Sequence, residues 1–339
     1  MEDIYVFKRI SVFFLVLLGA CSSVEDVPLP ITSSSPEALA LYEKGRLLKS
    51  QWNGQEADSV YKEALALDPD FIRANLEAEN NFSELGQLNR KNAIKNKANG
   101  SDAEEIIVDI YIAFEESRSN DALKLAEKLV DKYPNSSEAY RRLGFVKTEI
   151  SDFDGAIAAF LKATELNPKD ADSWYGLLSH QVQISGDKLA PDRLRNKKTA
   201  IKYADALIKA VPDGRGGYHP RGNIERADGN FEQAKEYYQE ALDISKRTKS
   251  EGVFRILNVA GHNYMFSGDN EKAISNYDQI IDNSKNSWFR FTISGYKANL
   301  SLFNGDFYDA ISVYEDTEKR MDGWGFSTSD LLSAKGRIN

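Results

Sequence analysis

Residues of the types that most often perform chemistry are few in this chain of 339 residues. It has three histidines, His180, His219 and His262, and one cysteine, Cys21. No two histidines have the close spacing of metal ligands, and one cysteine cannot form a site that needs several thiolates. Phosphate loops of the type G-x-x-x-x-G-K-[ST] and serine elbows of the type G-x-S-x-G are absent from the sequence. We therefore predict a protein that is not an enzyme and has no metal and no cofactor.

Two short segments resemble ligand loops but fit turns better. Residues 213–217 (Asp-Gly-Arg-Gly-Gly) are glycine-rich, yet they follow a predicted helix end and not a strand. Residues 152–155 (Asp-Phe-Asp-Gly) begin like a calcium loop without its remaining ligands. The 52 acidic residues guarantee accidental carboxylate pairs, so the sequence assigns no acid–base pair.

The single cysteine follows an apolar segment near the N-terminus. Lys8 and Arg9 precede the apolar run 10–18, which is too short to span a membrane comfortably. The run ends in Leu-Gly-Ala-Cys, and Cys21 is the last residue of that motif. This motif resembles the lipobox of bacterial lipoproteins, which implies removal of residues 1–20 as a signal peptide and lipidation of Cys21. The alternative is an ordinary signal peptide that a cysteine follows by chance.

Residues 21–36 are rich in Ser and Pro and have no helical periodicity, so we predict a flexible tether. Ser22 is not the aspartate that retains some lipoproteins in the inner membrane. Glu25 and Asp26 resemble the acidic pairs that mark surface export in certain lineages. Both features favour a cell-envelope lipoprotein of the outer membrane, held on the membrane through Cys21.

Composition argues against a nucleic-acid partner. The chain has 43 basic and 52 acidic residues, a formal net charge of -9. Binding to phosphates needs a surplus of Lys and Arg. The charges are interspersed, as on a solvated helical surface.

The body of the chain repeats a pattern of small, aromatic and helix-ending residues. The clearest copy consists of Tyr140, Leu143, Gly144, Ala156, Phe160, Ala163 and Pro168. Small residues let two helices approach closely, aromatics fill the adjoining space, and the proline ends the second helix. This pattern resembles the tetratricopeptide repeat, in which each unit is a pair of helices.

The second-helix part of the pattern recurs along the chain. Its first alanines are Ala57, Ala122, Ala156, Ala200, Ala234, Ala273 and Ala310. From Ala122 onward they step by 34, 44, 34, 39 and 37 residues. No period-two pattern is long enough to indicate a sheet. We therefore predict an all-α, right-handed α-solenoid over residues 37–339, with seven repeats.

Three parts of the solenoid are irregular in sequence. Residues 71–100 could hold a degenerate eighth repeat, with helices over 71–84 and 89–98. The 44-residue step predicts an insertion at 184–196. A capping helix is expected over 327–338, because a terminal repeat must cover an exposed apolar face.

The family resemblance also indicates which residues face a partner. First helices of tetratricopeptide repeats line the concave face, and transferring those positions to this chain predicts a groove with no acidic member. The predicted groove residues are Arg141, Tyr175, His219, Asn223, Arg226, Arg255, Asn258, His262 and Asn299. They predict binding of an acidic or carboxylate-ended segment, strengthened below about pH 6.5 if the histidines face it. Ordinary solvated surface is the alternative interpretation.

Two functions fit these features. The first is a membrane-anchored scaffold that binds a protein or peptide in the envelope. The lysines of the family's chaperone clamp are missing at the matching positions, so no chaperone partner is predicted. The second is a protein that captures glycans or nutrients for an outer-membrane transporter, with Trp288, Phe289 and Trp324 stacking on sugar rings.

Overall fold

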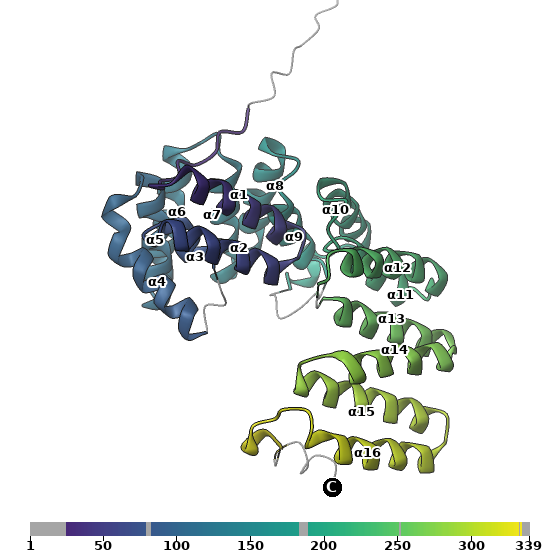
Figure 1. The fold of residues 1–339 in the computed structure, drawn as a ribbon. Helices are drawn as coiled ribbons and strands as arrows, with labels where there is room; N and C mark the ends of the chain where they lie inside the picture. The colour runs from purple at the N-terminus through teal and green to yellow at the C-terminus, as the bar shows by residue number, and fades with distance from the viewer. Residues whose placement is uncertain (1–24, 79–82, 183–188, 251, 332, 334–339) are drawn as a thin grey trace, which may run out of the picture.

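The protein consists of helices stacked in pairs. A computed structural model describes residues 25–78, 83–182, 189–250, 252–331 and 333. Over these ranges it has sixteen α-helices and no strand (Figure 1). The first eight are α1 (Pro36–Ser50), α2 (Gly54–Leu67), α3 (Ile72–Glu77), α4 (Glu84–Asn96), α5 (Asp102–Glu115), α6 (Ser119–Lys132), α7 (Ser137–Glu149) and α8 (Phe153–Leu166). The others are α9 (Ala171–Ser179), α10 (Lys197–Ala210), α11 (Tyr218–Ala227), α12 (Phe231–Arg247), α13 (Val253–Ser267), α14 (Asn270–Asn283), α15 (Ser287–Phe303) and α16 (Phe307–Met321).

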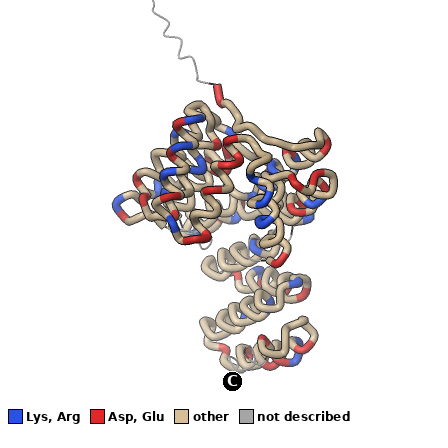
Figure 2. The backbone as a smooth tube through the Cα atoms, turned by 90° about the vertical axis from the view of Figure 1, so that its left-hand side faces the viewer, with Lys and Arg blue, Asp and Glu red and all other residues tan. Residues whose placement is uncertain are grey.

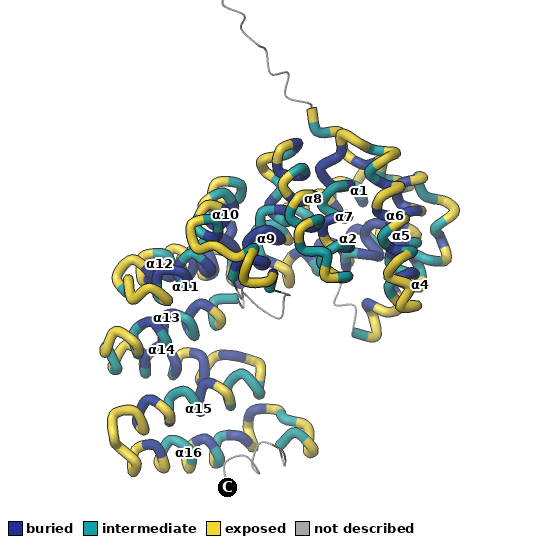
Figure 3. Tube along the Cα trace, turned by 180° about the vertical axis from the view of Figure 1, so that it is seen from behind, coloured by how far each residue is buried: buried dark blue, intermediate teal, exposed yellow. Residues whose placement is uncertain are grey.

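Consecutive helices form eight pairs, which confirms the all-α solenoid. The helices of each pair pack on each other, and first helices of neighbouring pairs also meet, as α7 meets α9 and α11 meets α13. Figure 3 shows buried positions where helices face each other and exposed positions at the turns. Basic and acidic positions alternate along the helices without one dominant patch (Figure 2).

A glycine under an aromatic ring sets the distance between the helices of four pairs. Each ring follows its glycine by sixteen residues: Tyr61 follows Gly45, Phe160 follows Gly144, Tyr238 follows Gly222, and Tyr277 follows Gly261. A Cβ atom at Gly261 would lie 2.6 Å from the Tyr277 ring, and one at Gly144 would lie 2.7 Å from Phe160. These four rings are at most 1% exposed. Only glycine permits this approach, so the first helix lies directly against the ring.

The turns inside the pairs are fixed by caps. The Asp152 side chain accepts a hydrogen bond from Gly155 N at 3.1 Å, which makes it the N-cap of α8. Asp269 and Asp306 cap α14 and α16 in the same way. The segment 152–155 is therefore a helix start, as predicted, and its carboxylate is used by the backbone.

The predicted eighth repeat is present as the pair α3–α4, with different bounds. Helix α3 stops at Glu77, not at 84, and α4 starts at Glu84, not at 89. Ser83 explains the second difference, because its side chain accepts a hydrogen bond from Gly86 N at 2.9 Å and caps α4. Residues 79–82, between the helices, lie outside the described ranges.

The described part of the predicted tether is instead a strap along the solenoid. Asp26 accepts hydrogen bonds from Ser137 N at 2.7 Å and from Asn167 Nδ2 at 3.1 Å. Leu29 is 2% exposed and packs in the core that contains Ile72 and Ala103. Further along, Glu104 accepts a hydrogen bond from Thr32 N, and Asp68 accepts one from Ser34 N. Residues 25–35, hereafter the strap, are thus fixed by partners far away in sequence, and the prediction of flexibility does not hold for them.

The insertion between α9 and α10 is described from residue 189. Ala190 is 2% exposed, and its N–H donates to the carbonyl of His180 at 3.1 Å. Gln181 binds Leu194 and Asn196 through its amide. Residues 183–188 lie outside the described ranges. So do positions 332 and 334–338 of the predicted capping helix, whose described part is helical from Thr328.

The solenoid curves so that its first pair contacts its fifth and sixth. Trp52, in the turn between α1 and α2, has φ 64° and lies with its ring 5.1 Å from the Tyr175 ring. A Cβ atom at Gly216 would lie 2.6 Å from Nε1 of Trp52. The glycine-rich segment 213–217 is therefore a repeat junction on which the first turn rests. In Figure 1, α11–α16 continue as a stack from the block formed by the earlier helices.

The glycine–ring contact yields a matched pair of substitutions. Gly261→Ala should lower the free energy of unfolding by about 1–3 kcal/mol, because the added methyl overpacks the Tyr277 ring. At Gly295 in α15, nothing lies within 4 Å of an added Cβ. Gly295→Ala should therefore raise the free energy of unfolding by about 1 kcal/mol, because alanine has the higher helix propensity. Urea denaturation measures both. Equal effects of the two substitutions would contradict the close-contact explanation.

Candidate functional site

Four of the nine predicted groove residues line one open concavity. His219 and Asn223 come from α11, and Arg255 and Asn258 from α13. The first turn and the loops before α11 and α15 complete the wall of this space of about 790 Å³. We call it the open groove; its other main lining residues are Lys49, Trp52, Arg215, Phe254 and Phe289.

The open groove is positively charged in a chain of net charge -9. Lys49, Arg215 and Arg255 line it, and none of the described residues that line it is acidic. Lys49 pairs with Glu77 at 2.6 Å, whereas Arg215 and Arg255 have no carboxylate partner among the described residues. Such a groove attracts a negatively charged segment of a partner.

Two asparagines supply polar groups to the same wall. Asn223 Oδ1 accepts a hydrogen bond from Tyr238 OH at 2.8 Å, which fixes its amide and leaves Nδ2 as a donor. Asn258 Oδ1 is buried without a hydrogen-bond partner. A donor and an acceptor on successive first helices can bind the backbone of an extended peptide.

The histidines do not become the pH-dependent cations that the sequence predicts. Burial, with Arg215, Arg226 and Arg255 adding to it, lowers the pKa of His219 to about 3. Burial and Arg226 lower the pKa of His262 to about 4. These low pKa values keep both imidazoles neutral at pH 5–7 and argue against the expected strengthening of binding below pH 6.5.

The remaining predicted groove residues lie elsewhere. Arg226 donates to the Val259 carbonyl at 3.1 Å and does not line the open groove. His262 and Asn299 line a separate space of about 190 Å³ between α13 and α15, beside half-buried or exposed rings such as Tyr296. Tyr175 packs on Trp52. Of the three aromatics suggested for sugars, Trp324 is 8% exposed and belongs to the core, which removes it as a stacking platform.

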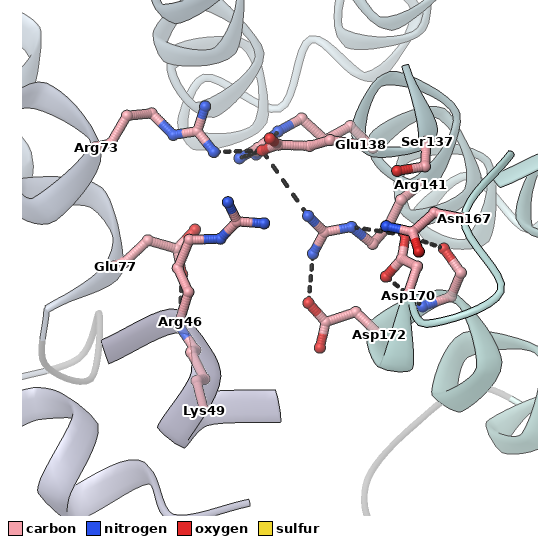
Figure 4. Close-up of polar contacts among 12 residues, drawn as sticks. Arg46, Lys49, Arg73, Glu77, Ser137, Glu138, Arg141, Asn167, Asp170 and Asp172 are labelled. Carbon is pink, nitrogen blue, oxygen red and sulfur yellow. Dashed lines mark hydrogen bonds and ion pairs between the residues drawn. The ribbon is translucent and has the colours of Figure 1, made fainter. Parts of the chain in front are cut away.

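Arg141 belongs to a second concavity of about 360 Å³ that is filled with paired charges (Figure 4). It forms ion pairs with Asp170 at 3.4 Å and with Asp172. Glu138 accepts hydrogen bonds from Arg73 and from Arg142, the latter at 2.8 Å. We call these residues, with the pair Lys49–Glu77, the inner charged cluster. Figure 4 shows the guanidinium groups of Arg46, Arg73 and Arg141 pointing toward its centre.

The inner charged cluster is electrostatically compensated. Arg73 is 1% exposed and Glu138 6% exposed. Burial alone would raise the pKa of the Glu138 carboxyl, but Arg73, Arg142 and Arg141 outweigh it and hold that pKa well below its ordinary value. Losing either partner would leave a buried charge alone, which typically costs about 3–5 kcal/mol. Since α3 supplies Arg73 and α7 supplies Glu138, the pair ties these two helices together.

The carboxylates of the inner charged cluster are engaged by Arg or Lys. Over the part of the chain that the structure describes, no three His, Cys, Asp or Glu side chains are grouped to hold a metal ion. In that same part, every helix is too short or too polar to cross a membrane.

Sequence reasoning missed Arg215, Lys49 and Trp52 in the open groove. Arg215 was seen only as part of a glycine-rich run, and Trp52 lies 163 residues before it. One feature of the sequence could have indicated this contact: a tryptophan, Trp52, stands at a turn position. Serines or glycines occupy positive φ in the corresponding turns, as at Ser151 and Gly268.

The depressed pKa of His219 predicts how acid affects stability. The folded protein disfavours protonation of His219, whereas the unfolded chain binds the proton with the ordinary pKa of 6.5. The contribution of the neutral imidazole to the free energy of unfolding is therefore fully present above pH 6.5, and it is lost as the pH drops toward 3. Between pH 7 and about pH 4.5, wild type should lose about 2 kcal/mol more than His219→Gln. Urea denaturation at both pH values measures this difference. Asn258→Gln, which removes no titrating group, should follow wild type; a His219→Gln curve parallel to wild type would contradict the neutral buried imidazole.

Comparisons with known proteins agree with this architecture. Family profiles described as tetratricopeptide repeat match residues 137–170 and 217–286. The protein O-mannosyl-transferase TMTC1 of mouse is 26% identical over 132 residues, and that of human 23% identical over 232 residues. These stretches cover 39% and 68% of this chain but only 13% and 22% of TMTC1. The chain thus spans less than a quarter of those relatives.

A solved structure with a TM-score above 0.5 shares this fold. The human IFIT1 dimer with PPP-AAAA superposes with a TM-score of 0.60 and 16% identity, covering 89% of this chain and 72% of that one. A tetratricopeptide repeat protein from Parabacteroides merdae covers 90% of this chain and 99% of its own, at a TM-score of 0.42 and 12% identity. The phased helix pairs, the glycine–ring contacts and the matching profiles lead to one conclusion: the chain is a tetratricopeptide repeat protein.

Proposed function

We propose that this protein is a membrane-anchored scaffold of the bacterial cell envelope that binds a segment of a protein partner in the open groove. Tetratricopeptide repeats generally mediate protein interactions, and the fold is typically a non-catalytic scaffold. The observation that carries the proposal is the open groove, where Arg215, Arg255, Asn223 and Asn258 converge without an acidic neighbour among the described lining residues. The similarity to TMTC1 covers too little of that protein to suggest mannosyl transfer.

The shape and polarity of the open groove suit an extended acidic segment. Its volume of about 790 Å³ accommodates several residues of a peptide. The asparagine amides can bind the peptide backbone, Arg255 can bind a carboxylate, and the rings of Phe254 and Phe289 offer apolar contact. The inner charged cluster differs from the open groove, because its carboxylates are already paired with Arg or Lys.

Lipidation of Cys21 would hold the solenoid close to the membrane. Asp26, which is hydrogen-bonded to Ser137, lies only five positions after Cys21. Five residues span at most about 18 Å, so the start of α7 would lie near the lipid surface. Ser22 and the acidic pair Glu25 and Asp26 support a location in the outer membrane, and Asp26 has this structural role as well.

The groove is tested by a double substitution. Arg255→Ala with Asn258→Ala should strongly reduce recovery of envelope partners by the purified protein, because one cation and one polar anchor are lost. A pull-down with quantitative mass spectrometry measures the recovery, after circular dichroism has shown unchanged helicity.

The matched control removes the same residue types from exposed helix ends. Arg247→Ala with Asn283→Ala changes an arginine that is 61% exposed and an asparagine at the end of α14. Partner recovery should equal that of wild type, and added salt should weaken wild-type recovery. If both double variants lose partners equally, or neither does, the open groove is not the binding surface.

The anchor is tested separately. Cys21→Ser should accumulate as an unlipidated precursor, because a serine has no thiol to accept the lipid. Labelling with a radioactive fatty acid and fractionation of membranes measure the outcome. Ser22→Ala should be labelled and cleaved normally. Cleavage of Cys21→Ser at the same bond, with normal membrane association, would refute the lipoprotein assignment.

A further inference from the structure

The guanidinium group of Arg215 is buried at the wall of the open groove, without a counter-ion among the described residues. The residue is 8% exposed, and Nε and Nη1 have no hydrogen-bond partner. Within the described ranges, Nη2 donates a hydrogen bond to the Trp52 carbonyl at 3.1 Å. No described carboxylate pairs with it, although the chain has 52 acidic residues.

The surroundings of Arg215 compensate its charge only in part. Its Cζ lies 5.5 Å from the centroid of the Trp52 ring, a cation–π contact. Burial, with Arg255 as a second cation nearby, lowers the pKa of Arg215 to about 10. His219, the titratable neighbour on α11, is neutral above pH 4 and supplies no negative charge. A buried cation of this kind is stabilised when an anion binds beside it.

We propose that Arg215 and Arg255 form a binding site for one oxyanion, a carboxylate or phosphate group of the segment that occupies the open groove. Nε and Nη1 of Arg215 are buried and unsatisfied in this structure; when the side chain turns toward the groove they donate hydrogen bonds to the anion, and the exposed Arg255 adds a second positive charge. This inference deepens the proposed function and rests on it only for the identity of the segment that carries the anion.

The site is composite, because two distant parts of the chain build it. Trp52 and Lys49 come from the first pair, whereas Arg215 and Arg255 come from the starts of the sixth and seventh pairs. Gly252 leaves room for the guanidinium group, since a Cβ there would collide with it. Anion binding therefore also favours the contact between the first turn, at Trp52, and Arg215.

Small anions test the site without knowledge of the partner. Sodium acetate and sodium phosphate are titrated into the full-length protein at constant ionic strength, with chloride as the balancing anion. Melting temperature is followed by circular dichroism, and an apparent Kd is taken from its dependence on anion concentration. A response to acetate alone identifies the ligand group as a carboxylate, and a response to phosphate alone identifies it as a phosphate ester.

Arg215→Met is the decisive variant. Its apparent Kd for the responding anion should be at least about tenfold weaker than that of wild type, because hydrogen bonds to a charged group are lost. Arg247→Met removes an exposed arginine and should respond as wild type does. Should Arg215→Met lose its helical signal, Arg255→Met at the exposed position gives the same comparison.

Two results would overturn the proposal. One is that neither anion raises the melting temperature of wild type. The other is that Arg215→Met and Arg255→Met respond like wild type. Either result leaves the peptide-binding function standing if the pull-down still depends on Arg255 and Asn258, so the two failures are distinguishable.

Discussion

The contact between a glycine and an aromatic ring sets the geometry on which the solenoid depends. Gly261 under Tyr277, and its counterparts in three other pairs, hold the two helices of a pair at a nearly constant distance. Pairs built on this contact stack on their neighbours, and the stack curves so that its first pair meets its fifth and sixth. That curvature carries the first turn to residues 214–216, and this return contact completes the wall of the open groove.

The return contact also explains an unusual residue in the first turn. Trp52 has a positive φ, which is costly for a bulky side chain. Serine or glycine occupies the corresponding turns, and a Cβ added at Gly229, Gly268 or Gly305 would meet nothing within 4 Å. At Trp52 the ring packs on Tyr175 and Gly216 and covers Arg215. The strained backbone is therefore retained where its side chain joins distant repeats.

Local patterns predicted the pairs, and distant contacts explain what they missed. Alanine spacing and turn residues indicated the repeats, because the contacts within a pair are local in sequence. The strap was mistaken for a tether because the partners of Asp26 lie more than 100 residues away. Arg141 was assigned to the groove because its position faces inward, but its guanidinium group forms ion pairs with Asp170 and Asp172. Arg215 escaped notice because its neighbour Trp52 is equally remote in sequence.

Site-specific photo-crosslinking in living cells tests the central claim most directly. A photoreactive amino acid replaces Asn258 in the wall of the open groove, or Lys235 on the exposed surface of α12. Crosslinked partner peptides are then identified by mass spectrometry. We predict that position 258 captures one recurring acidic segment of an envelope protein and that position 235 does not. Equal capture at both positions, or capture at position 235 alone, would contradict the assignment of the open groove as the binding surface.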